Sequence, residues 1–280
     1  MQDLLRHYGV SPREVHVLGE DGEDADSLVA NYLEAQWRAG AGIALANNTV
    51  AGVCSAVPKL RRRLDLSWAL LKAWRRAEPA ARVLPFTPEI VGAMAGLAAR
   101  AAAFDVACLL VISFEGLLRG GEAFALTAAD VLDRGEVIVL RIRTSKTAAG
   151  RDAAEAVVIR SQVAKQLLRL TVRGLQPGEA LSWRSPSQLR TSLATLARGL
   201  GVTGPFSWHS CRRGGASDFF LKSSSMEATL VRGRWASTMT ARIYIESAVA
   251  DLVRVRPEDD AAAAVRYGLQ LLKALSRLVL

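Results

Sequence analysis

The chain has 280 residues, half of them hydrophobic, a composition that excludes a disordered protein and supplies a sizeable core. Its longest apolar runs, such as VACLLVISF, are too short to cross a bilayer, and no secretory signal begins the chain, so we expect a soluble intracellular protein without a membrane partner. Lys and Arg number 36 against 27 Asp and Glu, and the net charge of +9 favours a polyanionic partner, most commonly nucleic acid. Cys54, Cys108 and Cys211 are far apart and lack metal-ligand spacing, which predicts buried free thiols rather than a disulfide or zinc site.

Residues 1–78 predict a small helical domain. The acidic stretch EDGEDAD (20–26) is typical of a solvated loop whose last residues, with Ser27, could cap the helix that follows. Apolar residues at helical spacing in SLVANYLEAQWRAG predict that helix. The stretch NNTVAGVCSAVPKLRRRLDLSWALLKAWRRA predicts two more, separated near Pro58.

A run of cations lies within this domain. Residues 59–76 hold seven basic side chains and one acid, and the basic residues alternate with leucines and Trp68. The seven are Lys59, Arg61, Arg62, Arg63, Lys72, Arg75 and Arg76. Two interpretations stay open, the solvated face of an amphipathic helix and a surface that follows DNA phosphates.

The remainder predicts a larger domain that is mainly helical. The stretch AEPAARVLPFTP (77–88) carries three prolines, and we assign the linker to residues 79–88 and a second domain to 89–250. Two or three buried helices come first, and two β-branched runs, Val137–Arg143 and Val157–Arg160, then flank a polar turn and predict a β-hairpin. Helices resume near Ser161, Ser187 and Ser207, and residues 251–280 form a C-terminal helix or tail. The fold class is therefore mainly α with a small β-hairpin or sheet (α+β).

Four polar features follow one another in the second domain. They are Arg119 with Glu122, Lys146 in the hairpin turn, His209 with Arg212, and Trp235 nine residues before Tyr244. His209 and Arg212 are three apart, so on a helix they share one face. Taken singly, each feature has an ordinary explanation, such as a helix-end arginine, a solvated lysine, core aromatics or a satisfied pair near a helix start.

Taken together, these features resemble the catalytic domain of the tyrosine recombinases, the phage-integrase family, over roughly residues 85–250. The first box reads GLLRGGEAFALTAADV and ends in the expected Asp130, the second reads HSCRRGGAS, and the third reads GRWASTMTARIY. There are three departures: Arg213 and Trp235 stand where many members have His, and an Arg before the Trp shifts the glycine by one place. Residues 1–78 are similar to the family's helical core-binding domain only in kind.

The resemblance implies a reaction at a DNA phosphodiester. Tyr244 would be the nucleophile and form a covalent 3′-phosphotyrosine, and His209 would accept or position its proton. Arg119 and Arg212 would hold the non-bridging oxygens, because guanidinium groups donate in pairs and stay charged. Lys146 would protonate the leaving 5′-oxygen.

Two further residues support this set by the same resemblance. Trp235 would donate its indole N–H to the phosphate and pack against the nucleophile's helix, and Glu122 would orient a basic partner. Arg213 could be another phosphate contact or a solvated neighbour, and the sequence favours the solvated neighbour. The positive charge of these groups would replace a metal ion, so no metal or cofactor is expected.

The leading hypothesis is thus a site-specific recombinase or integrase, acting on double-stranded DNA as a homo-oligomer, a tetramer, in whichever compartment holds that DNA. A type IB topoisomerase-like enzyme and a DNA-binding protein that no longer cuts are the alternatives, and RNA or membrane-surface binding is a third reading. The stripe Val265, Leu269, Leu272 and Val279 would pack on its own domain or on a neighbouring protomer.

Overall fold

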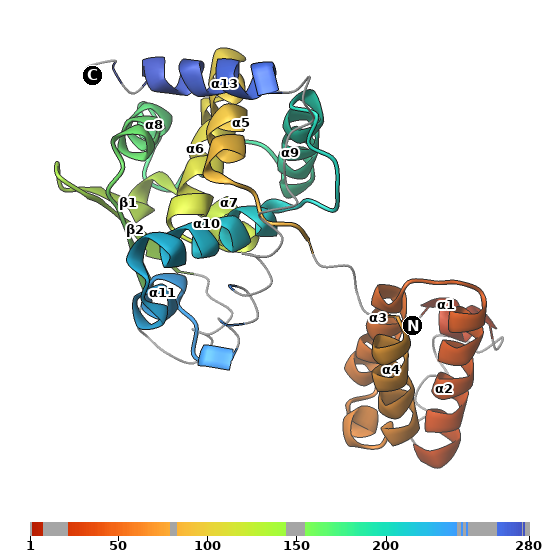
Figure 1. Ribbon diagram of the computed structural model, residues 1–280. Helices are drawn as coiled ribbons and strands as arrows, with labels where there is room; N and C mark the ends of the chain where they lie inside the picture. The colour runs from red at the N-terminus through yellow and green to blue at the C-terminus, as the bar shows by residue number, and fades with distance from the viewer. Residues whose placement is uncertain are drawn as a thin grey trace. The chain divides into compact units, whose positions relative to one another are not determined.

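The computed structural model describes residues 2–7, 22–78, 83–143, 155–239, 242, 245, 262–275 and 277. The chain divides into two compact units, Met1–Ala81 and Arg82–Leu280, and each has its own hydrophobic core (Figure 1). The predicted fold class, mainly helical with a small antiparallel sheet, is confirmed.

The first unit is helical throughout its described part. Its elements are α1 Gln2–His7, α2 Gly22–Arg38, α3 Ile43–Ala56, the short 3-10 helix η2 Pro58–Arg62 and α4 Asp65–Ala77. Leu33, Leu60, Leu71 and Trp74 are fully buried at its centre. The break predicted near Pro58 is confirmed, because proline favours the first turn of a helix and η2 begins there.

The acidic stretch 20–26 was predicted to be a solvated loop. This prediction is wrong for residues 22–26, because α2 begins at Gly22. Asp26 is buried, and its carboxylate accepts hydrogen bonds from the backbone N–H groups of Leu66 at 2.7 Å and Ser67 at 2.9 Å. The Ser67 hydroxyl donates to the same carboxylate at 2.6 Å. Asp26 therefore caps α4 from another helix, where its charge complements the positive end of the helix dipole.

The second unit contains the sheet and the remaining helices. Its elements are α5 Pro88–Arg100, α6 Phe104–Glu115, α7 Gly120–Phe124, η3 Ala128–Asp130, β1 Val131–Asp133, β2 Ile138–Ile142, β3 Glu155–Ile159, α8 Gln162–Val172, α9 Pro186–Gly199, α10 Trp208–Ser223, α11 Met226–Gly233 and α13 Ala262–Leu275. Residues 83–87 of the predicted linker lie in this unit, where Phe86 is fully buried and its N–H donates to Ser210 O at 3.1 Å.

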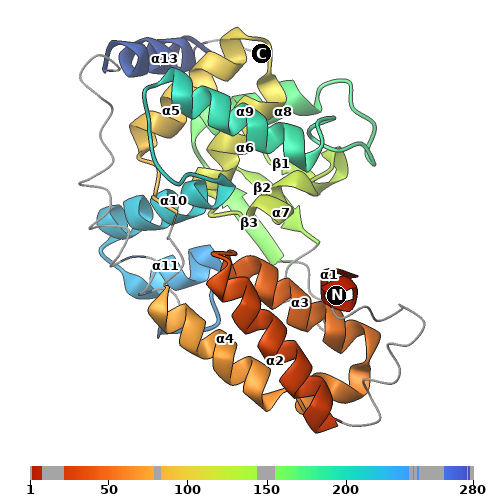
Figure 2. The ribbon, with the colours of Figure 1, turned by 90° about the vertical axis from the view of Figure 1, so that its right-hand side faces the viewer.

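Helix α6 runs through the middle of the second unit, with α5, α8 and α10 packed around it (Figures 1 and 2). Its sequence FDVACLLVISFE is apolar on nearly every side, as a helix surrounded by others must be. This central position also fixes the place of Arg119, because the C-terminal end of α6 leads into the segment that carries it.

The sheet has three antiparallel strands in the order β1-β2-β3, with Leu140 opposite both Val131 and Val157. The predicted hairpin of β2 and β3 is confirmed. Strand β1 was not predicted, because three residues, VLD, are too short for an alternating pattern to be recognised.

Serine side chains begin the later helices. Ser161, Ser185 and Ser207 accept a hydrogen bond from a backbone N–H in the first turn of α8, α9 and α10 respectively. The predicted starts at Ser161 and Ser207 are confirmed, whereas α9 is capped by Ser185, two residues before the start predicted at Ser187. The three cysteines are buried and free, also as predicted.

The last described helix, α13, packs on α5 at the opposite edge of the unit from α10 and α11 (Figures 1 and 2). A Cβ atom on Gly96 would collide with the carbonyl oxygen of Gly268, so both glycines allow the two backbones to touch. Val265 is buried there, and Leu269 and Leu272 contact the core. Within the described ranges, no helix is both long and apolar enough to cross a membrane.

Candidate active site

The site is built on the C-terminal end of α6. Helix ends leave backbone carbonyls without helical partners, and three arginines bind three consecutive carbonyls here. Arg232 donates to Glu115 O at 2.8 Å, Arg234 donates to Gly116 O at 3.2 Å, and Arg212 donates to Leu117 O. The negative end of the α6 dipole favours these cations, so the helix end gathers positive charge in one place.

Arg119 begins α7, directly after this carbonyl series. Its guanidinium forms an ion pair with Glu122 at 2.5 Å, and the Glu122 carboxylate also accepts the Arg119 backbone N–H at 2.9 Å. The Arg119 side chain is 28% exposed, whereas that of Glu122 is 2% exposed. Burial raises the pKa of Glu122, but the hydrogen bonds from Arg119 and the charges of Arg119 and Arg234 outweigh it and hold the pKa below its ordinary value. Glu122, to which the resemblance assigned the role of orienting a basic partner, is therefore paired with Arg119.

Arg212 lies on α10 and is 1% exposed. Besides its bond to Leu117 O, it donates to Gly233 O at 2.5 Å. Its guanidinium carbon is 4.7 Å from the centre of a Trp235 ring, so the two side chains stack. Arg212 thus joins the end of α6 to the end of α11 and the adjacent Trp235, two places that are far apart in the sequence.

His209 lies one turn before Arg212, at the start of α10 where Ser207 provides the cap. Burial, together with the charges of Arg212, Arg213 and Arg119, lowers the pKa of His209 to about 4. The effect of Arg119 shows that the first and second boxes share one electrostatic environment, although 90 residues separate them. The imidazole is therefore neutral at physiological pH.

Close packing brings α7 to the start of α10. A Cβ atom on Gly120 would lie 3.3 Å from Cβ of Trp208, the residue before His209, and the rings of Phe124 and Trp208 meet edge to face at 5.1 Å. On the other side of α10, a Cβ atom on Gly214 would collide with the carbonyl of Phe86. The glycines that follow the arginines in both boxes therefore allow the backbones to approach.

Arg213 differs from its prediction. The favoured interpretation, a solvated neighbour of Arg212, is wrong, because Arg213 is 4% exposed and donates to the carbonyl of Val83. Successive helix positions point about 100° apart, so Arg213 turns away from the side that Arg212 occupies and holds residues 83–87 against α10. Its charge still acts on His209.

The end of α11 holds two residues that the sequence interpretation missed. Arg234 has a left-handed backbone with φ of 55° and its side chain is 8% exposed. It forms ion pairs with Glu122 at 2.5 Å and with Glu155 at 3.0 Å. Arg232, two residues earlier, donates to Val158 O at 2.8 Å. The sequence RGRW shows an arginine directly before Trp235. Nothing in the sequence pattern predicts that these arginines bind carboxylates or carbonyls.

The structure thus brings together Arg119, Glu122, His209, Arg212 and Trp235. Lys146 and Tyr244 lie outside the described residues, so their places in the site stay predictions. The seven predicted basic residues of the first unit are all exposed, on η2, α4 and the residue between them. Arg75 donates to Asn47 Oδ1 at 2.5 Å, and Trp68 is 41% exposed among these cations.

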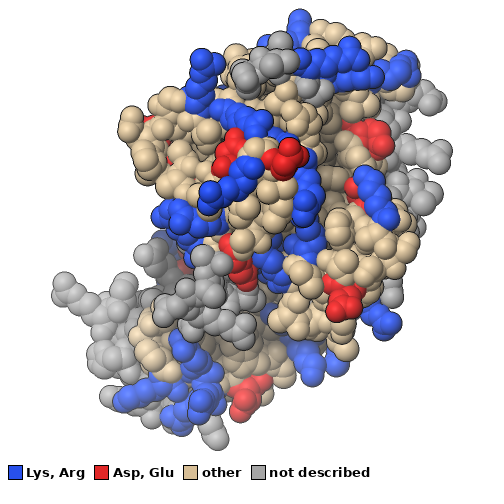
Figure 3. All heavy atoms as spheres, turned by 90° about the vertical axis from the view of Figure 1, so that its left-hand side faces the viewer, with Lys and Arg blue, Asp and Glu red and all other residues tan. Residues whose placement is uncertain are grey.

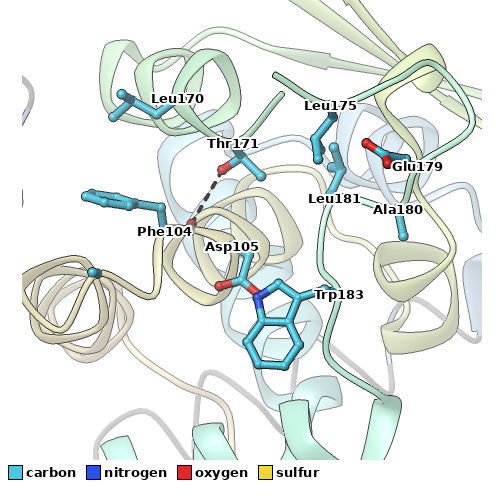
Figure 4. Close-up of a pocket in the computed structure, with 10 residues that line it drawn as sticks. Phe104, Asp105, Leu170, Thr171, Leu175, Glu179, Ala180, Leu181 and Trp183 are labelled. Atoms are coloured by element: carbon cyan, nitrogen blue, oxygen red, sulfur yellow. Dashed lines mark hydrogen bonds between the residues drawn. The ribbon is translucent and has the colours of Figure 1, made fainter. Parts of the chain in front are cut away.

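Two cavities of the second unit, each of about 490 Å³, lie away from these residues. One opens near the first turn of α6 and the end of α8, where Thr171 donates to Phe104 O at 3.5 Å and Trp183 is 78% exposed (Figure 4). The other is lined by residues of α5, α6, α10 and α13 and includes Arg232. None of the predicted site residues lines either cavity.

The fold and this cluster can be compared with known proteins. No protein-family model matches the chain, and no curated protein sequence matches it. Solved structures do, and they show the fold: the chain has a helical first unit and a second unit with a small sheet, as solved tyrosine recombinases do.

Two structures illustrate the likeness. The XerH site-specific recombinase bound to palindromic difH substrate, in a post-cleavage complex, has a TM-score of 0.56 and 15% identity, over 82% of this chain and 70% of that one. The Tn1549 transposon integrase in complex with transposon right end DNA has a TM-score of 0.53 and 12% identity, over 96% of this chain and 98% of that one. At these identities the likeness establishes the fold.

Proposed function

We propose that the protein cleaves and rejoins double-stranded DNA through a covalent 3′-phosphotyrosine, as a site-specific recombinase or integrase. The observation that carries this proposal is the convergence of three distant segments on the end of α6. Arg119 with Glu122, His209 with Arg212, and Trp235 come from separate parts of the sequence, and an ion pair, a stacking contact and the charges around His209 connect them.

The proposed step exchanges one phosphodiester for another. The phenolic oxygen of Tyr244 attacks the scissile phosphorus, the bond from phosphorus to the 5′-oxygen breaks, and Lys146 gives a proton to that leaving oxygen. The phenol proton passes to His209 directly or through water. Rejoining is the reverse, with the 5′-hydroxyl as nucleophile, so no bond energy is lost between the two halves.

Positive charge would stabilise the transition state. Arg119 is the most exposed of the four arginines that surround Glu122 and His209, so it is the one that a phosphate reaches first. Arg212 would add positive charge from its buried position and hold the Trp235 indole in place. A positioned donor of this kind is worth about 3–4 kcal/mol in comparable oxyanion sites.

His209 suits the role of proton acceptor only when a phosphate is bound. In the free protein, burial and the neighbouring arginines keep its pKa at about 4, which makes it a weak base. A bound phosphate would offset those charges and raise the pKa of His209, so the base would strengthen as the substrate arrives.

The surface charge supports duplex DNA as the substrate. The seven exposed cations of the first unit lie within residues 59–76, on η2, on α4 and at Arg63 between them. Lys and Arg side chains also spread widely over the surface drawn in Figure 3, with fewer Asp and Glu among them. Both solved structures described above are complexes, one with difH substrate and the other with transposon right end DNA. A tetramer on paired sites is the assembly that strand exchange requires.

Covalent trapping tests the proposal. Nicked duplexes of randomised sequence are incubated with the protein in EDTA; the nick lies just downstream of possible cleavage positions, so that a short 5′-hydroxyl fragment diffuses away. We expect a denaturing gel to show a protein–DNA adduct that is absent in Tyr244→Phe, and sequencing of the attached strand identifies the site.

The other outcomes separate the alternatives. Salt-sensitive duplex binding without an adduct would favour a DNA-binding protein that does not cut. An adduct together with relaxation of supercoiled DNA by the monomer, without exchange between two sites, would favour the topoisomerase-like reading. Failure to bind duplex DNA, with binding to RNA or anionic vesicles, would contradict the proposal altogether.

A further inference from the structure

Arg234 closes α11 in a conformation that arginine rarely adopts. Its φ is 55° and its ψ is 44°, the left-handed conformation in which helices most often place glycine. The backbone N–H groups of Arg234 and Trp235 bond to Val231 O and Leu230 O, each at 3.1 Å, as glycine would allow at this position. The helix end alone therefore gives no reason for an arginine.

The side chain supplies the reason. The Arg234 side chain is almost buried, and each of its three nitrogens contacts a different group. Nη2 lies 2.5 Å from Glu122 Oε2, Nε lies 3.0 Å from Glu155 Oε2, and Nη1 donates to Gly116 O at 3.2 Å. A planar guanidinium can make the hydrogen bonds to Glu122 and Gly116 O and the ion pair with Glu155 at the same time, and lysine cannot.

Glu122 is the shared member of this arrangement. Oε1 binds the Arg119 guanidinium at 2.5 Å, and Oε2 binds both the Arg119 N–H and Arg234. Each oxygen therefore has a defined cationic partner. Without Arg234, Oε2 would keep only the bond from the Arg119 N–H, so the carboxylate would be held less firmly and the Arg119 guanidinium would lose part of its fixed direction.

We propose that Arg234 is a positioning residue, which directs the partly exposed side chain of Arg119 toward the scissile phosphate by binding the Glu122 carboxylate. The series Arg119–Glu122–Arg234, called the arginine relay below, also ties this phosphate contact to Glu155 at the start of β3. This inference rests on the proposed function for its phosphate, and it adds a residue to which the recombinase resemblance assigns no role.

A double-mutant cycle with two readouts tests the relay. The variants are Arg234→Gly, which suits the left-handed backbone, Arg119→Ala and the combination, each made in the full chain. The readouts are the rate of adduct formation on the duplex found by trapping and the affinity for inorganic phosphate. Because Arg234 acts only through Arg119, we expect the combined variant to lose no more than Arg119→Ala alone.

The expected sizes are distinct. Arg119→Ala should slow adduct formation about a hundredfold to a thousandfold, as loss of a positioned donor does. Arg234→Gly should slow it roughly tenfold to a hundredfold, as loss of a supporting partner does, with duplex affinity unchanged. Arg234→Lys retains the positive charge but not the planar set of guanidinium donors, so its rate of adduct formation should lie between those of Arg234→Gly and the wild type.

Arg232→Met is the matched control. Arg232 precedes Arg234 by two residues and also binds a carbonyl at the end of α6, but its hydrogen bonds go to the carbonyls of Glu115 and Val158 rather than to Glu122 or Arg119. The fold-reduction in adduct rate caused by Arg232→Met should therefore multiply with the fold-reduction caused by Arg119→Ala. If Arg234→Gly also multiplies with Arg119→Ala, or leaves both readouts unchanged, the relay is wrong and Arg234 only supports the fold.

The two proposals can fail separately. If the wild-type protein binds phosphate but forms no adduct, and the effects of the two variants on phosphate affinity are non-additive, the proposed cleavage is overturned and the relay is retained. If the wild-type protein forms an adduct but the effects of the two variants multiply, the relay is overturned and the proposed cleavage is retained. Absence of phosphate binding and of any adduct would overturn both.

Discussion

The two units of the molecule use cations in opposite ways. In the first unit, seven basic side chains of η2, α4 and the residue between them are exposed, and Arg75 among them donates to the side chain of Asn47. In the second, Arg212 and Arg213 are buried, the side chain of Arg234 is only 8% exposed, and all three bind backbone carbonyls or carboxylates. The same residue type is therefore a solvated surface charge in one place and a fixed structural group in the other.

Under the proposed function, the two kinds of cation would recognise phosphate in different ways. Exposed cations on flexible side chains attract any polyanion and lose that attraction in salt, because each is surrounded by water and counterions. Buried guanidiniums, oriented before any ligand arrives, can stabilise charge that develops on one atom. The contrast predicts that the first group affects DNA affinity and the second affects reaction rate and stability.

The largest expected effect comes from Arg212. Replacing it by Met removes the bonds to Leu117 O and Gly233 O and the stack on Trp235, and it leaves two buried carbonyls without this donor. Charge-assisted hydrogen bonds contribute about 1.5–3 kcal/mol each, so we expect the free energy of unfolding to fall by about 3 kcal/mol or more. Urea denaturation measures this change.

Arg75→Met is the comparison for that experiment. Arg75 is exposed on α4, so its replacement should change the free energy of unfolding by less than about 0.5 kcal/mol. Equal losses in the two variants would contradict the contrast between the units.

A smaller effect is expected from the titration of His209. Its pKa is about 4 in the folded protein and near 6.5 when unfolded, so between these values the unfolded chain binds the proton and the folded chain does not. Stability from this group is complete above pH 6.5 and declines as the pH falls toward 4. A shift of this size corresponds to about 3 kcal/mol at most, and on the order of 2 kcal/mol is expected for a side chain that is only partly buried.

The His209→Gln variant isolates that contribution. It cannot take up a proton, so its stability should decline less than that of the wild type between pH 6.5 and 4, as followed by urea denaturation at each pH. Parallel curves for the two proteins would show that neither burial nor the arginines act on His209. The same comparison in the presence of inorganic phosphate should show a smaller difference, because the anion offsets the arginine charge.

The sequence predicted the parts of this site that depend on local spacing. The helices begin at Ser161 and Ser207 as expected, and Glu122, which the sequence places three residues after Arg119, pairs with it at a helix start. The resemblance added the order of the boxes, and hence the expectation that His209 and Arg212 approach Arg119. None of these inferences needed long-range contacts.

What the sequence did not predict depends on such contacts. Arg213 was interpreted as solvated because its partner, the Val83 carbonyl, lies 130 residues away and is a backbone group, which no residue pattern identifies. Arg234 was noted only as a departure from the pattern, although Glu122 and Glu155 make it part of the site. Strand β1 was missed because its partner strand, rather than its own three residues, makes it a strand.

The smallest effect on stability, and the clearest on affinity, is expected from the first unit. Lys72, Arg75 and Arg76 lie three and four residues apart on α4, so they share an exposed face. Changing all three to Gln should leave the free energy of unfolding nearly unchanged and weaken duplex binding in low salt. For each phosphate that the variant no longer neutralises, the slope of log affinity against log salt should become shallower by roughly 0.9, which a salt titration of binding measures.

Arg38→Gln is the control within the same unit. Arg38 is 80% exposed and pairs with Glu34 on α2, outside the basic run, so its loss should leave the salt slope unchanged. If the triple variant also leaves the slope unchanged, the seven cations are the solvated face of a helix and DNA binds elsewhere. If the triple variant makes the slope shallower but does not slow adduct formation at saturating DNA, affinity and catalysis are divided between the two units, as the burial of their cations indicates.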